Sequence, residues 1–237
     1  MFDQYTLKAR FYPVIILFFP LVVAGVFYSF EFKTAAHFLS SLGLVGALTY
    51  LFSQLGRDRG KQKEPALWQS WGGVPSVQLL RLTDSRINKH TKEKYHQKLQ
   101  GACPVPIAPT LTMEANNLPE ADEVYQAWTK HLIGQTRDTK KFSLLFKENI
   151  SYGFRRNLWG VKPIALFMIG LSLVTNYIFW YIRLRSFNPL IFPDSFWYSS
   201  AALFALLLFW IFIVKKAWVK IPALAYAERL CEAAEQI

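Results

Sequence analysis

The chain has 237 residues, a length that suits one or two soluble domains, but 52% of these residues are hydrophobic and 16% are aromatic. Charged residues make up only 18% of the chain, yet they leave a formal net charge of +11. A soluble fold with so few charges cannot easily cover that much apolar surface, so the composition argues against an ordinary soluble protein.

The apolar residues gather in four windows that contain no Asp, Glu, Lys or Arg. Each window approaches or reaches the roughly 20 residues that a helix needs to cross about 30 Å of hydrocarbon. They are residues 11–30, 34–56, 163–182 and 195–214. Lys8 and Arg10 before the first window would also suit a secretory signal, but the second window follows after only three residues, which favours a helical hairpin. We therefore predict an all-α membrane protein with four transmembrane helices in two hairpins, at residues 1–56 and 163–214.

The distribution of Lys and Arg predicts the orientation of these hairpins. Two lie in the amino-terminal tail, eighteen between Arg57 and Lys162, and four in the carboxy-terminal tail, so that 24 of 27 fall on one side of the membrane. The positive-inside rule then places both termini and the segment 57–162 in the cytoplasm of a bacterial cell, with the chain in the inner membrane. Cys103 and Cys231 both fall on this reducing side, so we expect no disulfide.

The segment 57–162 is predicted to form a small, mainly α-helical cytoplasmic domain inserted between the hairpins. Its basic start, residues 57–63, is expected to lie at anionic lipid headgroups. Asn88 is a suitable cap for a helix that runs to about Leu99, and Pro119 is suited to open another helix that stops at Gly134. The remaining expected elements are a short strand or helical turn at 77–80, an extended loop at 103–119, an amphipathic helix from about Asp138, and a cytoplasmic helix at 223–236 within the tail 215–237.

Two stretches of the chain carry a resemblance to known proteins. The first is Trp71-Gly72-Gly73-x-Pro75 followed by Leu80-Arg81, Asp84, Thr91-Lys92 and Tyr95-His96, and the second is Asn149 with Tyr152-Gly153-Phe154-Arg155-Arg156-Asn157-Leu158. Together they resemble an uncharacterised bacterial family of polytopic membrane proteins. The resemblance covers roughly a third of the chain and implies the same two-hairpin layout, but it implies no activity.

These two motifs also supply the candidate binding residues. The paired glycines let a ligand or another backbone approach closely, the Trp71 ring can stack on a planar group, and the basic side chains can bind phosphate or carboxylate. The candidate ligand- or partner-binding set is Trp71, Gly72, Gly73, Arg81, Asp84, Lys92, Tyr95, His96, Arg155, Arg156 and Asn157. The simpler interpretation, which we favour, is that the tryptophans anchor the chain at the headgroup level while the glycines form a turn.

The sequence contains no catalytic or metal-binding signature. Asp84, Glu93, His90 and His96 form the only neighbouring set that could suggest such a site, but the two histidines are six residues apart and would lie on different faces of a helix. No zinc motif, phosphate-binding loop, dinucleotide glycine pattern or nucleophile elbow accompanies them. We therefore expect surface histidines, no catalytic residue, no metal and no cofactor.

Within the predicted spans, small and polar residues indicate how helices pack. Ala36, Ser40, Gly43 and Ala47 form a stripe that allows close helix approach, either within one protomer or between protomers, and Asn176 is expected to hydrogen-bond to a neighbouring helix. No Asp, Glu, Lys or Arg lies inside any predicted span, which counts against proton-coupled transport.

The sequence therefore favours a non-enzymatic membrane protein. The leading hypothesis is a homo-oligomeric sensor or anchor that recruits or couples to a cytoplasmic protein, with a stress or phage-defence role suggested by analogy of layout alone. One alternative is an oligomeric channel or membrane-disrupting effector, and another is a membrane-bound enzyme acting on a phosphorylated or lipid substrate. The lysine-rich stretch 89–98 is the one basic region that membrane orientation does not explain, and we expect it to bind anionic lipid or a partner protein rather than nucleic acid.

Overall fold

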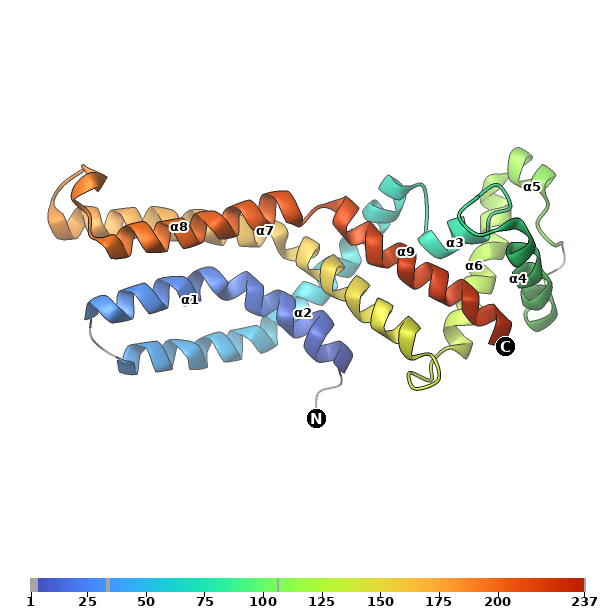
Figure 1. Cartoon of the computed structure of the whole chain (residues 1–237), viewed down its shortest axis with the longest axis horizontal. Helices are drawn as coiled ribbons and strands as arrows, with labels where there is room; N and C mark the ends of the chain where they lie inside the picture. The colour runs from blue at the N-terminus through green and yellow to red at the C-terminus, as the bar shows by residue number, and fades with distance from the viewer. Residues whose placement is uncertain (1–3, 33–34, 106, 237) are drawn as a thin grey trace. The chain divides into compact units, whose positions relative to one another are not determined.

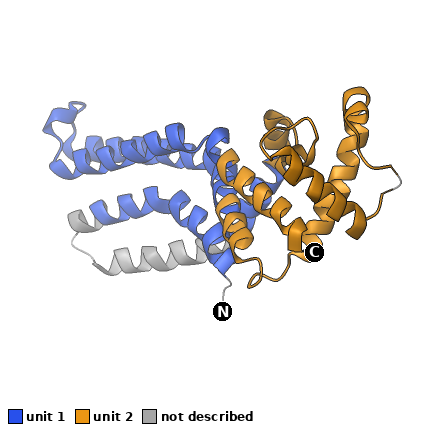
Figure 2. Ribbon diagram, turned by 45° about the vertical axis from the view of Figure 1, so that its right-hand side comes forward, with its two compact units in different colours: residues 1–63, 153–219 blue, residues 64–152, 220–237 orange. Residues whose placement is uncertain are grey.

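The computed structural model describes residues 4–32, 35–105 and 107–236, with side chains described outside residues 28–51. Every secondary-structure element in these ranges is a helix, which confirms the predicted all-α class for this part of the chain (Figure 1). Two compact units are present (Figure 2): unit 1 comprises residues 1–63 and 153–219, and unit 2 comprises residues 64–152 and 220–237.

Unit 1 contains most of the apolar helices. Its elements are η1 (Thr6–Phe11), α1 (Tyr12–Phe32), the first part of α2 (Ala35–Trp71), most of α7 (Ser143–Leu184), η2 (Pro189–Ile191), α8 (Asp194–Leu208), η3 (Phe209–Ile213) and the start of α9 (Lys216–Glu232). Within the part of the chain that the structure describes, three helical stretches are long and apolar enough to cross a membrane, namely Thr6–Phe27, Ser143–Leu184 and Asp194–Ile213. They overlap the predicted spans 11–30, 163–182 and 195–214. The predicted span 34–56 has most of its side chains outside the described residues.

The core of unit 1 is apolar and brings helices α1, α7 and α8 together. Leu17 of α1, Ile169 of α7 and Leu203 of α8 are fully buried in one cluster. At another point in this unit α2 meets α7, where a methyl group added to Gly160 would lie 2.8 Å from the Cα atom of Gly60. The two backbones therefore approach so closely that only glycine fits there.

Unit 2 has its own core, built from short helices. Its elements are the end of α2, α3 (Pro75–Leu80), α4 (Lys89–Ala102), α5 (Leu111–Asn116), α6 (Leu118–Gln135), the start of α7, most of α9 and η4 (Ala233–Gln236). Leu79, Leu99, Trp128, Leu132 and Leu230 are fully buried in a single cluster. Residues near the carboxy-terminal end of the chain are thus part of the core that α3, α4 and α6 form.

The helix starts follow the predicted signals in most places. The Asn88 side chain accepts a hydrogen bond from the His90 backbone at 2.9 Å and so caps α4, as expected, and Pro119 lies in the first turn of α6. Residues 75–80 form a helix, which decides between the two alternatives for this stretch. The extended loop predicted for 103–119 is wrong in its second half, because the Thr110 hydroxyl accepts from the Met113 backbone and caps α5.

Two other predicted helices have wrong starting points. Helix α7 begins at Ser143 rather than near Asp138, because the Asp138 carboxylate accepts hydrogen bonds from the backbones of Lys140 and Lys141 and holds a turn there. Helix α9 begins at Lys216 rather than at Ala223 and includes Pro222. Helix α7 therefore starts later, and α9 earlier, than the hydrophobic pattern alone indicated.

Candidate functional site

The turn after α2 is the local feature that organises the candidate site. The backbones of Gly72 and Gly73 have φ values of +88° and +129°, which side chains disfavour. The Gly73 N–H donates to the Trp68 carbonyl at 2.8 Å and the Gly72 N–H donates to the Gln69 carbonyl at 3.2 Å, the pattern that ends helices in a Schellman motif. Glycine at both positions thus stops α2 and reverses the chain into α3.

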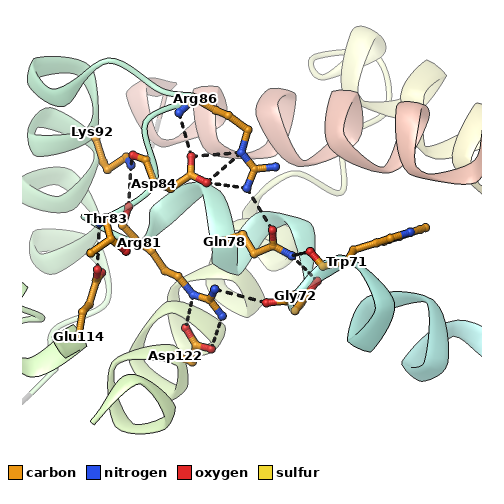
Figure 3. Close-up of polar contacts among 11 residues, drawn as sticks. Trp71, Gly72, Gln78, Arg81, Thr83, Asp84, Arg86, Lys92, Glu114 and Asp122 are labelled. Atoms are coloured by element: carbon orange, nitrogen blue, oxygen red, sulfur yellow. Dashed lines mark hydrogen bonds and ion pairs between the residues drawn. The ribbon is translucent and has the colours of Figure 1, made fainter. Parts of the chain in front are cut away.

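The side chain of Gln78 of α3 stabilises this turn. Its side-chain amide donates to the carbonyl oxygens of Trp71 at 3.1 Å and Gly73 at 2.6 Å, while its own oxygen accepts from the Arg86 guanidinium at 3.1 Å. The indole of Trp71 extends away from these contacts (Figure 3). The turn therefore has a fixed backbone and one half-buried aromatic side chain that takes no part in the polar network.

Arg81, immediately after α3, is held by a carboxylate on α6. Its Nε and Nη2 atoms donate to the two oxygens of Asp122 at 2.8 and 2.6 Å, and its Nη1 atom donates to the Gly72 carbonyl at 3.3 Å (Figure 3). Such a two-point pair is among the stronger side-chain interactions. The hydrogen bond to Asp122 raises the pKa of the Arg81 guanidinium above its usual value.

Glu114 anchors the next residues of the same loop from α5. Its carboxylate accepts hydrogen bonds from the backbone N–H groups of Leu82 and Thr83 at 2.6 and 2.9 Å, and from the Tyr125 hydroxyl at 2.7 Å. Burial is the largest single influence on the pKa of Glu114 and raises it, but these hydrogen bonds together bring it below its usual range. A buried charge is thus stabilised by three donors that all belong to the same unit.

Lys92 of α4 closes the loop from its other side. The side chain is buried, and its Nζ atom donates to the carbonyl oxygens of Arg81, at 2.6 Å, and of Asp84. Burial lowers the pKa of the Lys92 amine, although the nearby charges of Asp84 and Glu114 oppose the shift. The Asp84 carboxylate in turn pairs with Arg86 at 2.6 Å. This loop is therefore held by charged groups on α4 and α5 and by an ion pair of its own.

The two histidines of the segment have different environments. The Nε2 atom of His96 lies 2.8 Å from the Leu80 carbonyl, and its ring contacts those of Tyr125 and Trp128 at centroid distances of 5.6 and 5.1 Å. Burial lowers the pKa of His96, which favours the neutral ring donating to that carbonyl. His90 is exposed, and its side chain lies near Glu93 at 3.8 Å.

The remaining candidate residues fall into the core of unit 2 or into unit 1. Tyr95 is buried in the unit 2 core, and burial raises the pKa of its hydroxyl to about 12. In unit 1, Arg155 donates to the Trp218 carbonyl at 3.0 Å, while Asn157 donates to the Ala9 carbonyl at 2.8 Å. Arg156 is also buried in unit 1. The motif around Arg155 thus joins helices of unit 1, whereas the motif around Trp71 organises unit 2.

The helix-packing residues are described in part. The Asn176 amide donates to the hydroxyls of Ser199 and Ser200, both at 2.9 Å, and so links α7 to α8. The predicted stripe of Ala36, Ser40, Gly43 and Ala47 lies outside the residues whose side chains are described.

Several important members of the network were not among the predicted site residues. They are Gln78, Arg86, Glu114, Asp122 and Tyr125. Glu114 lies in a stretch predicted as an extended loop, and Asp122 lies in the helix predicted to start at Pro119. The only signal in the sequence was an acidic residue close to prolines. Such a signal does not identify the residue that the carboxylate contacts.

The geometry shows what this network does. The charged groups of Arg81, Lys92 and Glu114 each engage atoms of the same chain, so their hydrogen bonds fix the loop 81–88 between α3 and α4. Much of α4 remains accessible, including Lys89, whose side chain is 84% exposed. No protein-family model, curated protein or solved structure matches the chain.

Proposed function

We propose that the chain is a non-enzymatic, membrane-anchored coupling protein that recruits a soluble partner with an acidic surface. In this proposal two helical hairpins lie in a bacterial inner membrane, unit 2 lies in the cytoplasm, and several copies assemble. The observation that carries the proposal is the continuity of α7, a single helix from Ser143 to Leu184.

The continuity of α7 links a membrane anchor to a soluble module. Leu145 near its start is buried in the core of unit 2, whereas Ala165 and Ile169 are buried in the core of unit 1. Because α7 is one continuous helix, movement of unit 2 would act on the apolar helices without an intervening loop, and Pro163, which has no N–H to donate, marks the point at which the helix can bend. Partner binding at unit 2 would in this way be communicated to the apolar helices.

The exposed side of α4 is the proposed contact surface for the partner. The helix buries Lys92, Tyr95 and Leu99, and its other side carries Lys89 and Lys98. Lys94, on that side as well, forms an exposed ion pair with Glu235 at 3.0 Å. Exposed lysines held on a rigid helix favour association with a negatively charged surface.

Photocrosslinking in intact cells tests the partner. A photoreactive amino acid at the exposed position Gln97 should give a discrete adduct whose yield falls in Lys89→Glu/Lys98→Glu. The matched variant Lys130→Glu/Lys140→Glu reverses two exposed charges elsewhere in unit 2 and should keep the adduct. Equal loss in both variants, or no adduct at Gln97, would contradict the assignment of α4 as the contact surface.

A cysteine-labelling experiment tests the orientation. Lys94→Cys in a Cys103→Ser background should react with a membrane-impermeant maleimide only after spheroplasts are opened. Labelling from outside intact spheroplasts would refute a cytoplasmic unit 2. The assembly is tested separately, because a strictly monomeric mass in mild detergent would refute a homo-oligomer.

A further inference from the structure

Unit 1 carries a group of basic side chains at one end of its apolar helices. We call Lys63, Arg155, Lys162 and Lys215 the basic collar. The Lys162 ammonium donates to the Val214 carbonyl at 2.7 Å, and the Lys63 ammonium donates to the Gly160 carbonyl at 3.1 Å. These contacts tie α2 to α7 and α7 to the end of η3.

Aromatic rings accompany the collar. The charged groups of Lys63, Arg155 and Lys215 lie over the rings of Trp159, Trp218 and Phe212 at 5.3, 4.7 and 5.5 Å. Tryptophan and basic side chains that end an apolar helix are typical of the headgroup level of a bilayer. This places the collar at the depth of lipid phosphates, if the adjoining apolar helices lie in a membrane.

Two lysines of the collar carry charges that no described carboxylate of unit 1 balances. Among the described residues, no carboxylate lies within ion-pair distance of Lys162 or Lys215. The Lys162 ammonium contacts the carbonyl of Val214, the residue before Lys215, and burial together with repulsion by the charge of Lys215 lowers the pKa of Lys162. An anion between them would remove that repulsion, and the exposed ammonium of Lys215 has free donors for it.

An apolar strip leads along the helix to this charged pair. Phe204 and Leu208 lie one turn apart on α8, Ile211 and Phe212 follow in the π-helix η3, and the four side chains are 55%, 40%, 40% and 58% exposed. A soluble phosphate would use only the lysines, whereas a phospholipid would also cover this strip with an acyl chain. The combination of an anionic head and an apolar tail therefore fits the surface better than any small anion.

We infer that unit 1 binds an anionic phospholipid, with its phosphate between Lys162 and Lys215 and an acyl chain along Phe204, Leu208, Ile211 and Phe212. The site uses only residues of unit 1 and is independent of any partner that unit 2 recruits. It would tie the start of α9 to the headgroups, because Lys215 immediately precedes that helix.

Native mass spectrometry of the full chain in mild detergent tests the site. Phosphatidylglycerol should bind more tightly than phosphatidylcholine. Lys162→Gln/Lys215→Gln should lower the affinity for phosphatidylglycerol about 30-fold, since each lysine near an anionic lipid contributes a factor of about five. Lys162→Arg/Lys215→Arg should retain binding, which separates charge from folding. Lys130→Gln/Lys140→Gln removes two exposed lysines of unit 2 and should have no effect.

The acyl-chain half of the site has its own test. Phe212→Ser should weaken the binding of phosphatidylglycerol but should leave the binding of glycerol 3-phosphate unchanged. Equal binding of both lipids, equal loss in the unit 2 control, or competition by glycerol 3-phosphate at the concentration of the lipid would overturn the inference. Partner crosslinking at Gln97 is measured independently, so a failure of the lipid-binding inference can be told apart from a failure of the proposed partner binding.

Discussion

Replacing Glu114 with Gln tests whether this carboxylate holds the loop between α3 and α4. The two side chains have nearly the same shape, so the change removes charge without leaving a cavity. Oε1 accepts from the Leu82 N–H and the Tyr125 hydroxyl, and Oε2 accepts from the Thr83 N–H. A glutamine with its oxygen at the Oε1 position keeps two of these bonds but turns its NH₂ group toward the Thr83 N–H, so that two donors face each other.

The expected cost follows from these contacts. One hydrogen bond to a charged group is lost and one buried donor is left without an acceptor, which together cost about 2 to 3 kcal/mol. The change also removes a negative charge that lies near Lys92. We therefore expect the loop to open about 30- to 150-fold more often in Glu114→Gln than in the wild type.

Hydrogen exchange of the full chain in detergent measures this opening directly. Peptides that contain residues 82–86 should exchange faster in Glu114→Gln, while peptides from the apolar helices of unit 1 should not change. Glu123→Gln is the matched control, because Glu123 is exposed on α6 and its carboxylate makes no hydrogen bond or ion pair within the described residues. Unchanged exchange at residues 82 and 83 would refute the role given to Glu114.

The pH dependence of the wild type gives a second check on the same residue. Because the pKa of Glu114 is lowered in the folded state, its stabilisation is fully present above the pKa of the unfolded carboxyl and is lost as pH falls through the folded value. The difference in thermal stability between the wild type and Glu114→Gln should therefore be constant at neutral pH and shrink below about pH 4.5. A difference that persisted unchanged at pH 3 would contradict this reasoning.

Three further predictions concern the turn, the helix crossing and the buried histidine. Gly73→Ala should reduce the melting temperature more than Gly72→Ala. Both glycines have a positive φ, but only at Gly73 does an added methyl meet the Arg81 guanidinium, at 3.1 Å. Equal effects of the two substitutions on the melting temperature would contradict this reasoning. Gly160→Ala should destabilise the chain by several kcal/mol in thermal unfolding, because the new methyl meets the backbone of Gly60. His96→Gln should flatten the loss of stability between pH 7 and 5: the lowered pKa means that the wild-type stabilisation is present above the unfolded pKa of about 6.5 and is lost as pH falls toward the folded value. A parallel decline in the variant would exclude His96 as its source.

Much of the local structure could be predicted because its cause lies in neighbouring residues. The glycine pair after Trp71 forms the expected turn, Asn88 begins a helix and Pro119 opens another. The wrong boundaries have an equally local cause that the pattern does not reveal. Asp138 is of a residue type that often caps helices, but its carboxylate holds a turn in front of α7.

The candidate site was only partly predictable, because its contacts join distant parts of the chain. Arg81 was a candidate for binding an external phosphate or carboxylate, whereas in the structure its guanidinium binds Asp122, 41 residues away. The Asn157 amide reaches the Ala9 carbonyl across 148 residues. No pattern within one window specifies such partners.

The sequence by itself predicted a helical chain with four stretches apolar enough to cross a membrane, and three of these coincide with long apolar helices of the described residues, because length and hydrophobicity are properties of each stretch alone. Only the tertiary structure decided which charged groups are used internally and which stay open to a ligand. Lys92 is buried against two carbonyl groups, while Lys215 is exposed beside an apolar strip, although both are lysines in basic segments. The difference arises because an ammonium group is either desolvated or left in solvent according to the elements that pack around it.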